Sequence, residues 1–193
     1  FFQDWLDHPD YDDYWRVLSN RERYQDIGIP ILQIGGWYDF FTAGTFNNFV
    51  GMRERGGSDL ARNHQRAIIG PWVHRCSVLT HAGEVDFGKD SVLDLNDIEL
   101  RWFDHWLKGK SNQAEQDPPI KLFVMGINQW RDEQEWPLAR TSYTPYYFHS
   151  AGEANSLLGD GTLSVTSPWN EPPDHIVYNP EFPVPTKGGC NCC

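Results

Sequence analysis

The sequence predicts an α/β domain that is followed by an all-β region. Two apolar runs, at residues 29–34 and 67–69, stop at glycine and show no polar alternation, which is typical of buried parallel strands. After a polar linker at 110–118, residues 120–124 alternate with a period of two, and the later short runs are bounded by proline, glycine and asparagine. About four strands can be counted there, whereas a sandwich or jelly roll needs about seven or eight, so we expect only the start of a β domain.

Composition narrows the possible partners. The 193 residues carry 16 basic and 27 acidic side chains, a formal net charge of −11, which argues against nucleic acid and anionic membranes as partners. No apolar run approaches the roughly 20 residues that cross a bilayer, and the first residues, with Asp4 and Asp7, do not resemble a signal peptide. We expect a soluble protein, whether cytoplasmic or secreted, and its oligomeric state stays unknown.

Two candidate catalytic side chains follow the two predicted parallel strands. Asp39 comes directly after the stretch GGWY, and His74 comes directly after GPWV. Ligands collect beyond the carboxyl ends of parallel strands, and residues 42–56 supply a crossover helix, so the two side chains are expected close together. An acid followed by a histidine is the order of the last two triad members in α/β-hydrolases.

Each of these residues also has a structural interpretation. Asp39 could simply cap the next helix, and a histidine in a chain with seven of them is more often a surface or core residue than a base. The two motifs together favour catalysis, because the acid precedes the histidine at a suitable distance. Phe41, two residues after the acid, suits contact with the apolar part of a substrate and core packing equally well.

The next stretch contains a loop and a helix. His81, Glu84 and Asp86 lie in the loop, but nothing holds them on one helix face as in a zinc motif, and the cysteines at 190–193 are too few and too close for a structural zinc site. No metal site is predicted. The helix at 95–108 has an apolar stripe that we expect to pack as core: Leu95, Ile98, Trp102, Phe103, Trp106 and Leu107.

Several motifs, in the same order along the chain, resemble the cocaine esterase group of serine hydrolases. This group belongs with the X-Pro dipeptidyl-peptidases and the α-amino-acid ester hydrolases. The matching stretches are HPDYDDYW (8–15), GGWYD (35–39), GPWVH (70–74), LFVMG (122–126), WR (130–131), WPL (136–138) and PVPT (183–186).

The resemblance implies an α/β-hydrolase domain with a helical cap, followed by a jelly-roll β domain. Residues 1–26 would be the end of the cap, residues 27–110 the C-terminal part of the catalytic domain, and residues 119–193 the start of the jelly roll. Asp39 matches the catalytic acid of the family, and His74 matches its catalytic base.

The resemblance also suggests two substrate contacts in the cap. Asp12 could bind a substrate ammonium group, although aspartates at a helix start are usually solvated caps. Trp15 could line the pocket or fill the core beneath the cap.

The family nucleophile lies in an upstream serine elbow, and none of the ten serines here is flanked by glycines in that way. We therefore expect the nucleophile and the oxyanion donors outside this chain, and an inactive chain on its own. The predicted function is a serine hydrolase that cleaves a small-molecule ester or amide through an acyl-enzyme, with no metal or organic cofactor. An X-Pro dipeptidyl-peptidase and a noncatalytic β-binding module are the alternatives.

Overall fold

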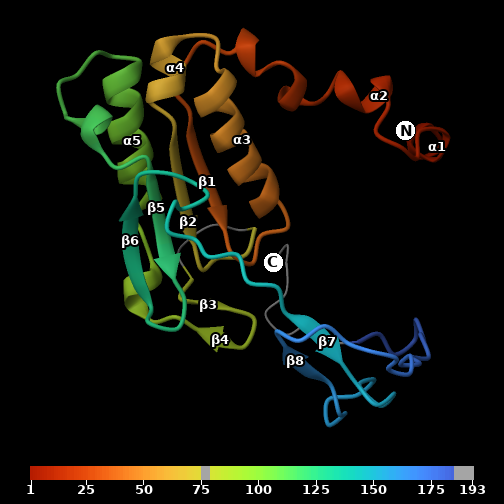
Figure 1. Cartoon of the computed structure of the whole chain (residues 1–193). Coiled ribbons are helices and arrows are strands. Elements are labelled where there is room, and N and C mark those ends of the chain that lie inside the picture. Colours follow the sequence, from red (N-terminus) through yellow and green to blue (C-terminus); the bar gives the residue numbers. More distant parts are fainter. Residues whose placement is uncertain (75–78, 185–193) are drawn as a thin grey trace. The chain divides into compact units, whose positions relative to one another are not determined.

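The computed structural model describes residues 1–74 and 79–184, and the chain divides into two compact units. The first unit contains residues 1–138, and the second begins at Ala139 (Figure 1). Within the described residues, no helix is both long enough and apolar enough to cross a membrane. Cys76 and the three cysteines at 190–193 lie outside the described residues.

A four-stranded sheet in the order β1-β2-β5-β6 is the centre of the first unit (Figure 1). The strands β1 (Leu32–Gly36), β2 (Arg66–Gly70) and β5 (Ile120–Val124) run parallel, and β6 (Gln129–Glu133) returns antiparallel to β5. All five residues of β2 are buried, as a central parallel strand requires. The predicted mixed α/β architecture is confirmed for this unit.

Helices and a small hairpin connect these strands. The helices α3 (Thr42–Arg55) and α4 (Asp59–Asn63) join β1 to β2, while β3 (His81–Ala82), β4 (Val85–Asp86) and α5 (Leu95–Trp106) lie between β2 and β5. The shorter helices are α1 (Phe2–Asp7), α2 (Asp13–Arg16), η1 (Asn20–Glu22), η2 (Tyr24–Asp26), η3 (Lys89–Ser91) and η4 (Ala114–Gln116).

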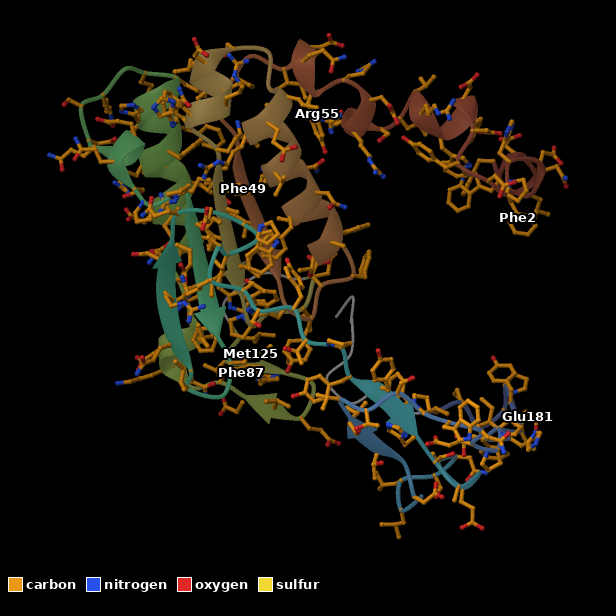
Figure 2. All side chains as sticks on the ribbon, in the orientation of Figure 1. Phe2, Phe49, Arg55, Phe87, Met125 and Glu181 are labelled. Atoms are coloured by element: carbon orange, nitrogen blue, oxygen red, sulfur yellow. The ribbon has the colours of Figure 1, made fainter. Side chains whose placement is uncertain are left out.

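The main core lies between α3 and the sheet. Phe46 and Phe49 of α3 pack against buried residues of β2 and β5, and Figure 2 shows the side chains that gather around Phe49. A second cluster joins η2 to the same helix, because Tyr24 packs on Met52 and Ala61. A Cβ atom at Gly51 of α3 would overlap the Tyr24 ring, so only glycine allows this close contact.

A partly buried charge network holds the beginning of β2. Arg66 and Arg101 both donate to the same carboxylate oxygen of Asp117. Burial lowers the pKa of the Arg66 guanidinium, and the neighbouring Asp117 carboxylate opposes that shift. The network ties β2 to α5 and to the segment before β5.

The helix α5 differs in part from its expected packing. Trp102 is buried, but Phe103 is 48% exposed and Leu107 is 76% exposed, so the prediction that the aromatic residues of this helix are core is wrong for Phe103. Consecutive residues of a helix are separated by about 100°, so Trp102 and Phe103 cannot both point to the same neighbour.

The second unit contains one small hairpin. The strands β7 (Tyr147–His149) and β8 (Thr162–Ser164) pair antiparallel, and the described residues around them form turns and extended segments (Figure 1). Within the region that the sequence analysis assigned to the β domain, β5 pairs with β2 in the sheet of the first unit, and β6 pairs with β5. An alternating pattern marks a strand but does not say which sheet the strand joins.

Candidate active site

The candidate site forms where β1 and β2 end. The two strands pair in register from Leu32 with Arg66 to Gly36 with Gly70. Their pairing continues past the sheet, since Trp37 N donates to Gly70 O (2.8 Å) and Tyr38 N donates to Trp72 O (3.0 Å). The two chains therefore leave the sheet side by side.

Glycine makes this close approach possible. A Cβ atom at Gly36 would overlap the carbonyl oxygen of Trp72, and one at Gly70 would overlap the Trp72 ring. The Trp72 indole is buried, and its Nε1 donates to Ser91 O (3.2 Å). Gly36 is thus also the position where the two backbones touch, and Gly70 makes room for the Trp72 ring.

Asp39 lies in a tight turn between β1 and α3. Its backbone N donates to Gly36 O (3.0 Å), and Thr42 Oγ1 donates to Asp39 O (2.6 Å) and to Gly36 O. The Asp39 carboxylate accepts from Phe41 N (2.8 Å) and is only 5% exposed. The carboxylate thus closes a turn that precedes α3, but it does not cap that helix: the N-cap residue is Phe41, and no side chain caps it, so the capping role considered for Asp39 is wrong.

The same carboxylate meets His74. The Nδ1 atom of His74 lies 3.1 Å from Asp39 Oδ2 and 3.2 Å from Oδ1. A carboxylate can only accept, so this contact selects the state in which Nδ1 carries a proton. The imidazole is 42% exposed, whereas its acidic partner is buried. The structure thus brings together the two residues singled out in the sequence.

Two aromatic rings flank the imidazole. The Phe40 ring centroid lies 4.9 Å from that of His74 with planes 39° apart, and the Phe41 ring lies 5.1 Å away, edge-on at 71°. Phe41 was predicted as a possible substrate contact. The sequence analysis did not single out Phe40, although this residue directly follows the candidate acid Asp39.

Asp12 and Trp15 have contacts within the N-terminal helical segment. Asp12 caps α2 through Tyr14 N (3.0 Å) and lies 2.5 Å from His8 Nδ1; the hydrogen bond with His8 is the main cause that lowers the Asp12 pKa. Trp15 Nε1 donates to His8 O (2.8 Å). These contacts account for the local fold, so the predicted roles of Asp12 and Trp15 in substrate binding stay predictions.

The potential metal ligands considered in the sequence lie in the β3–β4 hairpin. His81 and Asp86 are register partners across the β3–β4 hairpin. Nowhere in residues 1–74 and 79–184 do three or more histidine, cysteine, aspartate or glutamate side chains form a group that could hold a metal ion.

Comparison with known proteins decides the family. The model of the X-Pro dipeptidyl-peptidase (S15 family) matches residues 1–75, and that of the X-Pro dipeptidyl-peptidase C-terminal non-catalytic domain matches residues 112–181. Cocaine esterase from Rhodococcus sp. (strain MB1 Bresler) is 35% identical over 187 residues, 95% of this chain. The chain belongs to the cocaine esterase and X-Pro dipeptidyl-peptidase group. The resemblance that the motifs predicted is confirmed.

The chain spans only part of its relatives in this group. It covers 31% of the Rhodococcus cocaine esterase and 19% of a putative serine esterase from Mycobacterium bovis, which is 28% identical over 138 residues, 69% of this chain. The family boundary at residue 112 falls before β5, whereas the two units of the structure separate after β6.

Two solved structures show the same fold as this member of the group. An α-amino acid ester hydrolase matches with a TM-score of 0.66 at 22% identity, over 88% of this chain and 27% of its own. An aminopeptidase from a marine sediment Thaumarchaeota archaeon matches with a TM-score of 0.63 at 20% identity, over 87% and 26%.

Proposed function

We propose that Asp39 and His74 are the acid and the base of a serine hydrolase that cleaves an ester or amide bond of a small molecule through an acyl-enzyme. One observation supports this proposal above the others. A buried carboxylate contacts the Nδ1 atom of a partly exposed histidine at the carboxyl ends of adjacent parallel strands, in a chain of a hydrolase group.

In the proposed mechanism, Asp39 accepts the hydrogen bond from Nδ1 and so directs Nε2 toward the reaction. A serine hydroxyl from another part of the enzyme gives its proton to Nε2 while its oxygen attacks the substrate carbonyl. Asp39 then stabilises the imidazolium that forms. His74 returns the proton to the leaving group, which leaves an acyl-enzyme. Water then attacks the acyl group while His74 takes its proton, and His74 returns that proton to the serine as the acid product leaves.

Two substrate classes fit this site. Identity to cocaine esterase over most of the chain supports an ester, and the match to the S15 model supports an X-Pro dipeptide as the alternative. A nitrophenyl ester and an X-Pro nitroanilide, assayed side by side, would separate the two classes by their kcat/KM values.

We also propose the roles of the flanking regions. Residues 1–26 would end a cap in which Asp12 and Trp15 contact the substrate, and Phe41 would meet its apolar part beside His74. Residues 119–193 would be the start of a jelly-roll domain whose first two strands, β5 and β6, extend the sheet of the first unit. The match to a non-catalytic domain model supports a role outside the chemistry. A noncatalytic β-binding module without hydrolase activity is the remaining alternative.

The test uses the complete reading frame that encodes this chain and a fluorophosphonate probe, which labels activated serines. We expect the probe to label the native protein, and kcat to fall by about 10³-fold or more in His74→Ala and in Asp39→Asn. In His74→Ala the serine has no general base, and in Asp39→Asn the histidine is no longer held in the tautomer that can accept the serine proton. His64→Ala is the matched control, since His64 is the C-cap residue of α4 and its Nδ1 contacts Leu60 O (3.0 Å).

Labelling that is equal in the native protein, His74→Ala and Asp39→Asn would contradict the proposal. The pair would then be structural, and the binding module would replace the hydrolase as the interpretation. The 193-residue chain by itself is expected to show no labelling, because none of its serines lies in an elbow motif.

A further inference from the structure

The turn that holds Asp39 also presents two adjacent phenylalanines to His74. The Phe40 and Phe41 ring centroids are 4.1 Å apart, and the two rings meet the imidazole at 39° and 71°. The Phe40 ring is therefore tilted against the imidazole, and the Phe41 ring meets it in a T-shaped arrangement.

Core packing does not explain the position of Phe40. Its side chain is 46% exposed, and it lies outside the three buried clusters of the described residues. An aromatic ring that stays near solvent loses part of the free energy that burial would provide. Among the described residues, its ring lies against those of Phe41 and His74.

The two rings add to the support of the imidazole. The hydrogen bond to Asp39 fixes the position of Nδ1, and the tilted Phe40 ring and the T-shaped contact of Phe41 restrict the orientation of the ring further. An aromatic face also attracts a cation, so it stabilises the imidazolium more than the neutral imidazole.

We propose that Phe40 is a positioning residue that holds the His74 imidazole in the orientation in which Nδ1 donates to Asp39. This inference rests on the proposed function of the Asp39–His74 pair. It gives the two phenylalanines different tasks: Phe40 acts through His74, and Phe41 contacts the substrate.

The two tasks predict different kinetics. Loss of a group that orients the base lowers kcat and leaves KM nearly unchanged, whereas loss of a substrate contact that is equal in the ground and transition states raises KM. We therefore expect Phe40→Leu to lower kcat by about 3- to 30-fold with little change in KM, and Phe41→Leu to raise KM.

The experiment measures kcat and KM for p-nitrophenyl acetate in the protein from the complete reading frame. Phe40→Tyr keeps the ring and should restore most of the activity that Phe40→Leu loses. Phe103→Leu is the matched control, because Phe103 is 48% exposed on α5. The NMR signals of the His74 ring should move in Phe40→Leu and keep their positions in Phe103→Leu.

Three outcomes would overturn the inference. In the first, Phe40→Leu behaves like Phe103→Leu in kcat and in the His74 signals. In the second, Phe40→Leu raises KM alone, which would mean that Phe40 contacts the substrate. In both cases an inactive Asp39→Asn variant would show that the proposed function still holds. If Asp39→Asn kept full kcat, the proposed function would fail, and the role of Phe40 would fail with it.

Discussion

The two units of this protein are stabilised in different ways. The first unit has an apolar core, with Phe49, Ile69 and Ile120 fully buried. In the second unit none of the described residues, 139–184, is buried, and Phe148 is 86% exposed. Burial of apolar surface therefore stabilises the first unit, and another kind of contact must hold the second.

Carboxylates provide those contacts in the second unit. Asp174 accepts from Ser150 Oγ (2.8 Å) and from Ala154 N (2.7 Å), and Asp160 accepts from Ala151 N (2.7 Å). The two carboxylates thus bind the segment that directly follows β7. Hydrogen bonds to charged groups are stronger than neutral ones, but at exposed positions solvent competes for them.

His149 adds a contact that depends on its charge. Its Nδ1 lies 2.6 Å from Glu171 Oε1, and its Nε2 lies 2.9 Å from Thr166 O. Both partners can only accept, so both ring nitrogens must carry protons. The hydrogen bond with Glu171 is the main cause that raises the pKa of His149. The pH should therefore affect a contact that holds the second unit together.

The largest expected effect tests the core of the first unit. We expect Phe49→Ala to lower the free energy of unfolding by about 3–5 kcal/mol, because it leaves a cavity in a closely packed site. The matched change Phe148→Ala should alter it by less than about 0.5 kcal/mol, since that ring is exposed. Urea denaturation of the chain, followed by circular dichroism, measures both. Equal losses would mean that the two units do not differ as described.

An intermediate effect tests how tightly the first unit is packed. In α3, a methyl group at Gly51 would overlap the Tyr24 ring, whereas one at Gly44 meets nothing within 4 Å. We expect Gly51→Ala to destabilise by about 1–3 kcal/mol through overpacking. Gly44→Ala should stabilise by up to about 1 kcal/mol, because alanine favours a helix. If both changes stabilised the chain in the same denaturation experiment, the contact of Tyr24 with α3 would be looser than the structure shows.

The smallest effect concerns His149. Its pKa is raised above its ordinary value of 6.5, so its stabilisation is fully present below pH 6.5 and is lost as the pH rises through the higher folded value. The hydrogen bond with His149 is the main cause that lowers the Glu171 pKa below its ordinary value of 4.5, so that contribution is present above pH 4.5 and is lost as the pH falls through the lower folded value. The pair should therefore be strongest between about pH 4.5 and 6.5.

NMR titration of the histidine rings checks this window. Glu171→Gln should lower the pKa of His149, and the backbone signals of Ser150 and Thr166 should follow the His149 titration. His175→Gln serves as the control in the same unit. A His149 titration that Glu171→Gln leaves unchanged would contradict the charged contact and weaken the comparison of the two units.

The sequence by itself determined the elements that depend on local pattern. The apolar runs before Gly35 and Gly70 predicted the parallel strands, and residues 42–56 predicted the helix between them. These signals are strong because a buried strand or helix face shows its period within a few residues. The motifs around Asp39 and His74 also led to the family, since the spacing of strand, glycine and polar residue is itself a local pattern.

Tertiary structure alone decided the rest. The alternation at 120–124 did not reveal that β5 pairs with β2, and the stripe on α5 did not reveal that Phe103 would face solvent. Likewise, Phe40 lies against His74 only because Gly36 lets the two strand ends touch. The pairing of β5 with β2 and the contact of Phe40 with His74 join residues that are far apart in the sequence. A hydrophobic pattern specifies which face of an element is apolar without specifying which partner covers it.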